Sequence, residues 1–265
     1  MNGYDAARIG AALRRGGGTR RLEVRDEVGS TQDLAFLIAE HGAPDGSLVL
    51  ADRQTGGRGR LGRRWDSPAG LGAWMSFVLR PTAPAPPGPV LVAATALAVA
   101  EAVEGTSGVR ASLRWPNDLL AADRKLAGIL VETRDFDPAA PLFVLGIGIN
   151  VSQRESDFPP EVRSEATSLA LAGTAPDRSA LIEAVVLSLE EWRGRLARGD
   201  AASVEDAYAS RAAYLGRPVT VLEGAADLAG TLEAASPTSG LRLRLADGSV
   251  RTVRPEHARD LRPAP

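Results

Sequence analysis

The chain has 265 residues, a hydrophobic fraction of 44% and a formal net charge of −2. This composition is typical of a globular protein, and the charge argues against bulk electrostatic binding to nucleic acid or to an anionic membrane. There is no cysteine, and neither of the two histidines lies near a serine motif. Disulfides, cysteine-based zinc sites, thiol catalysis and a serine–histidine mechanism are therefore excluded.

Neither a membrane span nor a signal peptide is predicted. No apolar run approaches the roughly 20 residues of a membrane helix. Arginines at positions 8, 14 and 15 interrupt the segment that would form a signal-peptide core. We therefore expect a cytoplasmic protein.

The apolar pattern predicts an α+β fold. In chain order we expect a helix over 4–15, a strand over 22–28, a helix over 31–41, strands over 47–52 and 73–79, a buried helix over 90–103, strands over 110–115, 125–134 and 142–151, and helices over 178–198 and 202–214. Together they predict a mixed β-sheet of about seven strands, backed by helices, as a first domain over residues 1–214.

The pattern changes after Gly216. Short alternating segments over 218–222, 228–234, 241–245 and 250–253 predict strands, and Asp247 with Gly248 forms a two-residue hairpin signal. We expect a small β-barrel as a second domain over residues 215–265.

The helix over 31–41 begins at a motif of hydroxyl side chains. Ser30 and Asp33 have the spacing of a capping box, and Gly42 is a typical helix stop. By themselves, Ser30 and Thr31 are explained equally well as a helix cap or as part of a binding site, and the two roles are compatible.

Residues 54–65 form a loop with four glycines and four arginines between positions 56 and 64. Glycines let the backbone wrap around a ligand, and arginines bind carboxylate and phosphate through forked hydrogen bonds. Gly57 and Gly62 have P-loop spacing, but arginines stand where that motif needs Lys and Ser or Thr. An anion-binding active-site loop and a nucleic-acid contact, with Trp65 stacking on a base, both remain open.

Lys125 is the single lysine, beside 30 arginines within the total of 31 basic residues. An ammonium is compact, whereas a guanidinium is a wide planar fork, so a single lysine among many arginines indicates a catalytic or binding role for Lys125. The simple alternative is an exposed lysine left by chance. The strand before it should end at Pro116, with Asn117 and Asp118 in a loop. Asn117 and Asp118 also suit an ordinary turn.

Four segments in order resemble the biotin–protein ligase family. They are residues 29–33 (GSTQD, the family's GSTN motif), 57–65 (GRGRLGRRW, its GRGRxGRxW loop), 115–130 (WPND…KLAGIL) and 144–150 (VLGIGIN, its GxGxN strand). Gln32 departs from the family, which usually has Asn there. The resemblance implies an α+β catalytic domain followed by an SH3-like β-barrel, in the short class without an N-terminal DNA-binding domain.

The resemblance implies a two-step ligase. Biotin and ATP with Mg²⁺ give biotinyl-5′-AMP, and a lysine of a biotin carboxyl carrier protein, a domain of a biotin-dependent carboxylase, then takes the biotin. A lipoate or octanoate ligase or transferase of the same fold is the alternative within the class. A non-catalytic biotin-binding or nucleic-acid-binding module is the alternative outside it. We expect no nucleic-acid or membrane partner, and a monomer or homodimer.

The resemblance also implies roles for individual residues. Lys125 and Arg60 are implied to be catalytic, and Asp118 to be the Mg²⁺ ligand. Trp65 should pack near adenine, and the strand around Gly128 should receive the thiophane ring and valeryl chain. The biotin-binding residues are Ser30, Thr31, Gln32, Gln54, Gly57, Arg58, Gly59, Arg60, Lys125 and Gly128. The ATP-binding residues are Arg60, Arg63, Trp65, Asn117 and Asn150.

Overall fold

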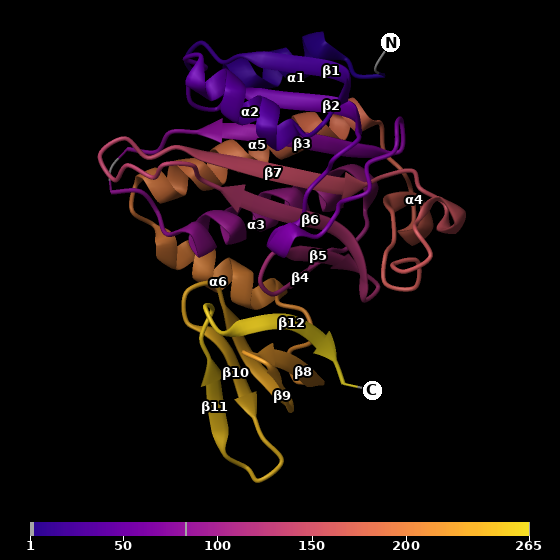
Figure 1. The fold of residues 1–265 in the computed structure, drawn as a ribbon, viewed down its shortest axis with the longest axis vertical. Coiled ribbons are helices and arrows are strands. Elements are labelled where there is room, and N and C mark those ends of the chain that lie inside the picture. Colours follow the sequence, from indigo (N-terminus) through magenta and orange to yellow (C-terminus); the bar gives the residue numbers. More distant parts are fainter. Residues whose placement is uncertain (1–2, 83, 265) are drawn as a thin grey trace.

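The structure is a computed structural model that describes residues 3–82 and 84–264. Its larger part is a seven-stranded sheet of order β1-β2-β3-β7-β6-β5-β4 (Figure 1). β1 and β2 are parallel, and the other neighbouring strands of this sheet are antiparallel. The strands are β1 (Leu22–Val28), β2 (Leu48–Gln54), β3 (Gly72–Leu79), β4 (Ser112–Arg114), β5 (Asp118–Ala121), β6 (Arg124–Glu132) and β7 (Phe143–Asn150). The predicted mixed sheet is confirmed.

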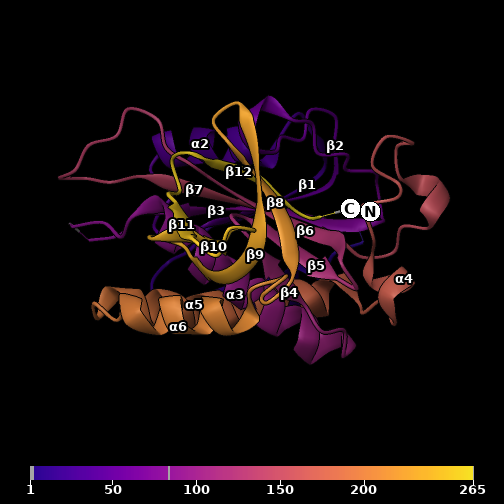
Figure 2. The same cartoon turned by 90° about the horizontal axis from the view of Figure 1, so that it is seen from below.

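Helices cover both faces of this sheet (Figure 2). One face packs against α3 (Gly88–Ser107), α5 (Arg178–Ala197) and α6 (Ala201–Arg211), and the other packs against α2 (Thr31–Glu40). Helix α1 (Ala6–Arg15) lies against α5 and β1. The short helical segments are η1 (Arg60–Gly62), η2 (Glu155–Asp157) and α4 (Leu169–Ala172).

Strand periodicity decides which residues face α2. Successive side chains of a strand point to opposite faces, so Leu145 and Ile147 enter the main core while Val144 packs with Phe36 of α2. Gly146 and Gly148 alternate with the same core residues, so they lie on the α2 face as well. Strand β7 therefore presents every second residue to the face of the sheet that α2 covers.

Helix α3 extends beyond the predicted 90–103 to Gly88–Ser107. By length and composition it could cross a membrane, but 67% of its most apolar window is buried. It packs against α5 and α6, as the core helix of a globular protein does. Trp192 of α5 is 4% exposed, which confirms its predicted place in the core.

The C-terminal part is a five-stranded sheet of order β11-β10-β9-β8-β12, drawn in yellow and orange in Figure 1. Its strands are β8 (Pro218–Glu223), β9 (Ala226–Ser236), β10 (Gly240–Arg244), β11 (Val250–Val253) and β12 (Ala258–Pro263). Its buried face, which includes Val219 and Leu243, is continuous with the core of the larger sheet. The predicted β domain is confirmed, while the boundary at residue 214 stays a prediction.

Two strands were not predicted. Asp118 begins β5 instead of lying in a loop, because residues 118–120 pair with both β4 and β6. The turn from β5 to β6 uses Ala122 and Asp123 at positive φ, a pair that carries no glycine signal. β12 was missed because arginine and aspartate separate its two buried residues, Ala258 and Leu261.

Candidate active site

A cavity of about 700 Å³ lies on the α2 face of the larger sheet and brings the four motifs together. Of the predicted site residues, the cavity is lined by Ser30, Thr31, Gln32, Gln54, Arg58, Gly59, Arg60, Arg63, Trp65, Asn117, Asp118, Lys125, Gly128 and Asn150. Gly57 is the exception. A side chain there would lie 2.4 Å from the Trp65 carbonyl oxygen, so Gly57 allows the loop to close on itself.

The start of α2 forms one polar wall of the cavity. Ser30 Oγ accepts from the Gln32 amide as the helix cap. The Thr31 amide and hydroxyl both donate to Gln54 Oε1, at 2.8 and 3.0 Å. Ser76 on β3 donates to the Thr31 hydroxyl at 2.8 Å. Ser30, the helix cap, and Thr31, the first residue of the helix, therefore both line the cavity, while their contact with a ligand stays a prediction.

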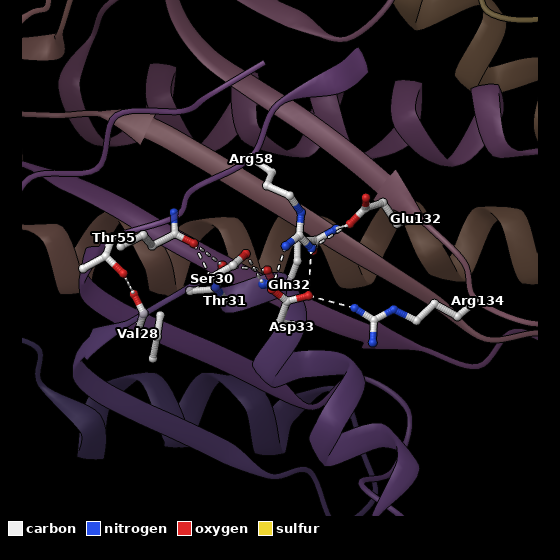
Figure 3. A network of polar contacts seen from close by, with 11 residues as sticks. Val28, Ser30, Thr31, Gln32, Asp33, Thr55, Arg58, Glu132 and Arg134 are labelled. Carbon is white, nitrogen blue, oxygen red and sulfur yellow. Dashed lines mark hydrogen bonds and ion pairs between the residues drawn. The ribbon is translucent and has the colours of Figure 1, made fainter. Parts of the chain in front are cut away.

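Asp33 does not complete the predicted capping box. Its carboxylate pairs with Arg58 at 2.6 and 3.0 Å and with Arg134 at 2.8 Å (Figure 3). These hydrogen bonds, from Arg58 above all, lower the pKa of Asp33 below its usual range. Ion pairs with Arg58 and Arg134 have replaced the Asp33 half of the capping box, whereas Ser30 still caps the helix.

The Trp65 ring lies on two glycines that face each other across β6 and β7. Gly128 pairs with Gly148, and a Cβ at either position would lie 3.0 or 2.5 Å from the ring. Trp74 on β3 meets the ring edge-on at 6.5 Å between centroids. The missing side chain of Gly128 makes room for Trp65, and its expected contact with the thiophane ring and valeryl chain stays a prediction.

Lys125 is neither free nor fully exposed. Its Nζ lies 2.7 Å from Asp118 Oδ1 and 5.2 Å from the Trp65 ring centroid. Arg114 holds the other carboxylate oxygen of Asp118, also at 2.7 Å. The side chains of Lys125 and Asp118 are 30% and 12% exposed. Lys125 is therefore not a freely exposed lysine, and its catalytic role stays a prediction.

The backbone of Lys125 is fixed by a segment that the sequence motifs do not include. Its amide donates to the Glu165 carbonyl at 2.6 Å, and its carbonyl accepts from the Thr167 amide at 2.9 Å. The same segment supplies apolar cavity walls through Phe158 and Val162. It has no regular periodicity, so nothing in the sequence marked it as part of the site.

Asn150 organises this segment. Its Nδ2 donates to the Thr167 carbonyl at 2.9 Å, and its Oδ1 accepts from Gln153 at 3.1 Å. The residue is 5% exposed. Both ends of the amide have protein partners, so the nucleotide contact expected for Asn150 stays a prediction.

Three of the four loop arginines that line the cavity, Arg58, Arg60 and Arg63, are held at separate points. Arg58 binds Asp33 and Arg60 donates to Asn117 Oδ1 at 3.3 Å. Burial, together with neighbouring Arg259 and Arg63, lowers the pKa of Arg60, while Asp118 opposes this shift. Arg63 binds Asp260 of β12 at 2.9 and 3.1 Å.

The metal prediction rests on one carboxylate. Residues 3–82 and 84–264 contain no group of three or more His, Cys, Asp or Glu side chains suited to a metal ion. Both oxygens of Asp118 are paired with cations. A divalent ion would therefore gain a single protein carboxylate and would compete with Lys125 and Arg114 for it.

Comparison with known proteins identifies the family. A family model described as the biotin/lipoate A/B protein ligase family matches residues 26–150. A biotin–[acetyl-CoA-carboxylase] ligase of Paracoccus denitrificans is 32% identical over 223 residues, covering 81% of this chain and 90% of that protein. The chain belongs to the biotin–protein ligase family.

Two further relatives bear on the extent of the likeness. A biotin protein ligase from Aquifex aeolicus, solved in complex with biotin and ATP, has a TM-score of 0.80 and 31% identity, covering 93% of this chain and all of that chain. The bifunctional ligase/repressor BirA of Bacillus subtilis is 41% identical over 173 residues, or 65% of this chain. The chain spans about half (53%) of the length of that relative.

Sequence reasoning missed one residue of the cavity lining, Asp260. It lies in the strand that was not predicted, and its φ of 46° places it at an irregularity in the pairing of β12 with β8. The hydrogen bond from Arg63 lowers the pKa of Asp260. The C-terminal sheet thus holds the arginine-rich loop directly.

We expect Gly148→Ala to displace the Trp65 ring, since the added methyl would lie 2.5 Å from Nε1. The other three tryptophans are at most 4% exposed, so a red shift in emission and stronger acrylamide quenching would report Trp65. Gly105→Ala, which adds a methyl in open space on α3, is the control. Unchanged emission and quenching in Gly148→Ala would contradict this packing.

We expect Asp260→Ala to speed trypsin cleavage after Arg63, because the loop loses its contact with β12. The side chains of Arg63 and Asp260 are 65% and 40% exposed, so they form a surface ion pair. The rate of cleavage should therefore rise about two- to fivefold when the pair is lost. Peptide mass spectrometry measures the cleavage. Glu223→Ala breaks a pair with Arg251 inside the same domain and serves as control. Equal cleavage in both variants would show that Asp260 does not restrain the loop.

Proposed function

We propose that the protein is an ATP-dependent ligase that activates biotin as biotinyl-5′-AMP and transfers it to a lysine of a biotin carboxyl carrier protein. The observation that carries the proposal is the convergence of four separate motifs on one cavity around Lys125. Further support comes from the Paracoccus relative, named as a biotin ligase, and from the Aquifex structure with biotin and ATP.

The residues suit the charges of this reaction. An oxygen of the biotin carboxylate attacks the α-phosphorus of ATP, which forms the mixed anhydride and releases pyrophosphate. Two anions must approach, so the site has to neutralise charge as it develops. Lys125 and Arg60 are the cations proposed for this, with Arg58 at the loop. An incoming carboxylate and phosphate would take the ammonium from Asp118.

The cavity has polar groups for the ureido ring of biotin and apolar groups for the thiophane ring that is fused to it. Ser30, Thr31 and Gln54 offer hydroxyl and amide groups to the ureido ring. The strand surface around Gly128 is the apolar surface that we propose for the thiophane ring and the valeryl chain. A loop that closes over the adenylate would protect it from water.

Asp118 fits a magnesium ion that arrives with the nucleotide, since Mg²⁺ is commonly held by one or two carboxylates, phosphate oxygens and water. When bound, the ion would neutralise phosphate charge. Asn117 lies beside Asp118 and is held by Arg60 and by the Ile129 carbonyl, which it reaches at 2.9 Å. We place Asn117, Arg63 and Trp65 on the nucleotide side of the cavity.

The second step needs a carrier with an accessible lysine. Its amine attacks the carbonyl of the mixed anhydride, which forms an amide and releases AMP. We propose the carrier domain of a biotin-dependent carboxylase as this partner. A cytoplasmic enzyme, monomeric or homodimeric, would meet such a carrier directly.

ATP–pyrophosphate exchange tests the proposal against its alternatives. Exchange that depends on biotin supports the ligase. Exchange with lipoate or octanoate, and none with biotin, would assign the chain to the related acyl ligases. No exchange with any acid, together with biotin or nucleic-acid binding, would indicate a binding module.

We expect Lys125→Arg to lower the exchange rate roughly 100- to 1000-fold, or about 3–4 kcal/mol, the loss typical of one preorganised electrostatic group. The charge is kept, but the guanidinium cannot occupy the compact place of the ammonium between Asp118 and Trp65. Arg124→Lys, the reverse change at the neighbouring position outside the cavity, should stay within a few-fold of the parent. A Lys125→Arg variant of parental activity would remove Lys125 from the mechanism.

We expect almost no self-biotinylation. Adenylate that leaves the site acylates amines, but the one lysine is held by Asp118 as a paired ammonium, and arginine does not react. Intact-mass spectrometry with biotin and ATP, without carrier, should find label confined to the N-terminal amine. Arg53→Lys, which puts a lysine at an exposed position, should acquire biotin there. Substantial label on Lys125 would contradict its assigned place.

A further inference from the structure

Gln32 has a buried carbonyl that nothing in the described residues satisfies. The residue is 3% exposed, and its Oε1 has no hydrogen-bond partner among the atoms of residues 3–82 and 84–264. The amide lies against Gly146 of β7, where a Cβ would be 2.9 Å from Oε1. Both residues line the cavity. A buried acceptor without a donor is unfavourable, so this atom is suited to a ligand N–H.

Glu132 decides which end of the Gln32 amide faces the cavity. Its Oε2 accepts from Gln32 Nε2 at 2.9 Å (Figure 3). An ionised carboxylate only accepts hydrogen bonds, whereas an amide has a donating and an accepting end. The NH₂ group is therefore held by Glu132, and the carbonyl is left on the opposite side.

Glu132 is available for this task because Arg58 is held mainly elsewhere. Arg58 reaches the same Glu132 oxygen only at 3.4 Å but binds Asp33 at 2.6 Å. Arg134 adds a second bond to Asp33 and stacks over Phe36 at 4.1 Å. Figure 3 shows these side chains converging from α2, the arginine-rich loop and the end of β6.

We propose that Glu132 is a positioning residue that fixes the Gln32 carbonyl as the acceptor for a ureido N–H of biotin. The inference rests on the proposed function and adds a second polar contact zone to it, apart from Ser30, Thr31 and Gln54. A cyclic urea offers two N–H donors, so it can use an acceptor in each zone. Gln32, which stands where the family usually has Asn, is then part of ligand recognition.

Experiment can distinguish a positioning role of Glu132 from a role in the stability of the fold. The Glu132 side chain is 35% exposed at the end of β6, so shortening it leaves no core cavity. Glu132→Gln keeps the shape, but its amide can donate to Gln32 Oε1 as well as accept from Nε2. Both orientations of Gln32 then become possible. Glu132→Ala removes the restraint altogether.

The experiment measures the biotin Kd by calorimetry for the parent, Glu132→Gln and Glu132→Ala, with unfolding curves to establish that each variant is folded. We expect Glu132→Ala to bind biotin about tenfold more weakly, which is the loss of about one hydrogen bond. In pyrophosphate exchange the KM for biotin should rise, while kcat and the KM for ATP stay unchanged.

Rescue supplies the matched control. In the double variant Gln32→Glu with Glu132→Gln, residue 132 donates and residue 32 presents an oxygen to the cavity in either orientation. Net charge is conserved, and affinity should recover to within a few-fold of the parent. Biotin analogues with a ring oxygen in place of one or the other ureido N–H identify the donor. The analogue that lacks the N–H contacted by Gln32 should bind the parent and Glu132→Ala with the same, weakened affinity.

The outcomes separate the two proposals. If the parent binds no biotin and supports no exchange, the proposed function fails, and this inference fails with it. If the parent binds biotin and Glu132→Ala binds it equally well, only the positioning role of Glu132 is overturned. A loss that is the same for biotin and for both analogues would also overturn it, because the effect would then not pass through a ureido N–H.

Discussion

The site depends on three positions of the sheet that carry no side chain. Gly128, Gly146 and Gly148 lie on one face of β6 and β7, at the centre of a sheet whose strands are otherwise packed with large residues. Side chains there would fill the space over the sheet, as Val144 does further along β7 under α2. With glycine, Trp65 rests on two of the positions and Gln32 on the third. The cavity is the space that remains beside them.

The cationic side chains around these glycines are paired with carboxylates. Lys125 and Arg114 share Asp118, and loop arginines are held by Asp33 and Asp260. Such pairing lowers the cost of holding several positive groups in one place before a substrate arrives. An anionic substrate then competes with protein carboxylates for these groups, which ties its binding to the position of the loop. The C-terminal sheet contributes Asp260, which binds Arg63, so residues from both parts of the protein hold the arginine-rich loop.

Much of the site was accessible from the sequence because its parts are short and local. The helix start at Ser30, the glycine–arginine loop and the retention of a single lysine are each visible within about a dozen residues. The strands that carry them have clear periodicity, so their order on the chain was predicted well. The predictions were wrong where the contact that determines a residue's conformation comes from a part of the chain far away in the sequence. Asp33 fits a local capping box, yet two arginines from other elements take its carboxylate. Asp118 looked like a turn residue, yet pairing with β4 and β6 makes it the first residue of a strand.

The sequence by itself determined the fold class, the family and the residues at which chemistry is possible, because these follow from periodicity and from motifs of fixed spacing. Only the tertiary structure decided how those residues are used. It placed Trp65 against Gly128 and Gly148, gave both ends of the Asn150 amide to the segment behind Lys125, and brought Glu132 to Gln32 and Asp260 to Arg63. The physical reason is that a side chain's partner is set by which strands lie side by side. That order places β7 between β3 and β6, and β12 beside β8, in a way that no local pattern encodes.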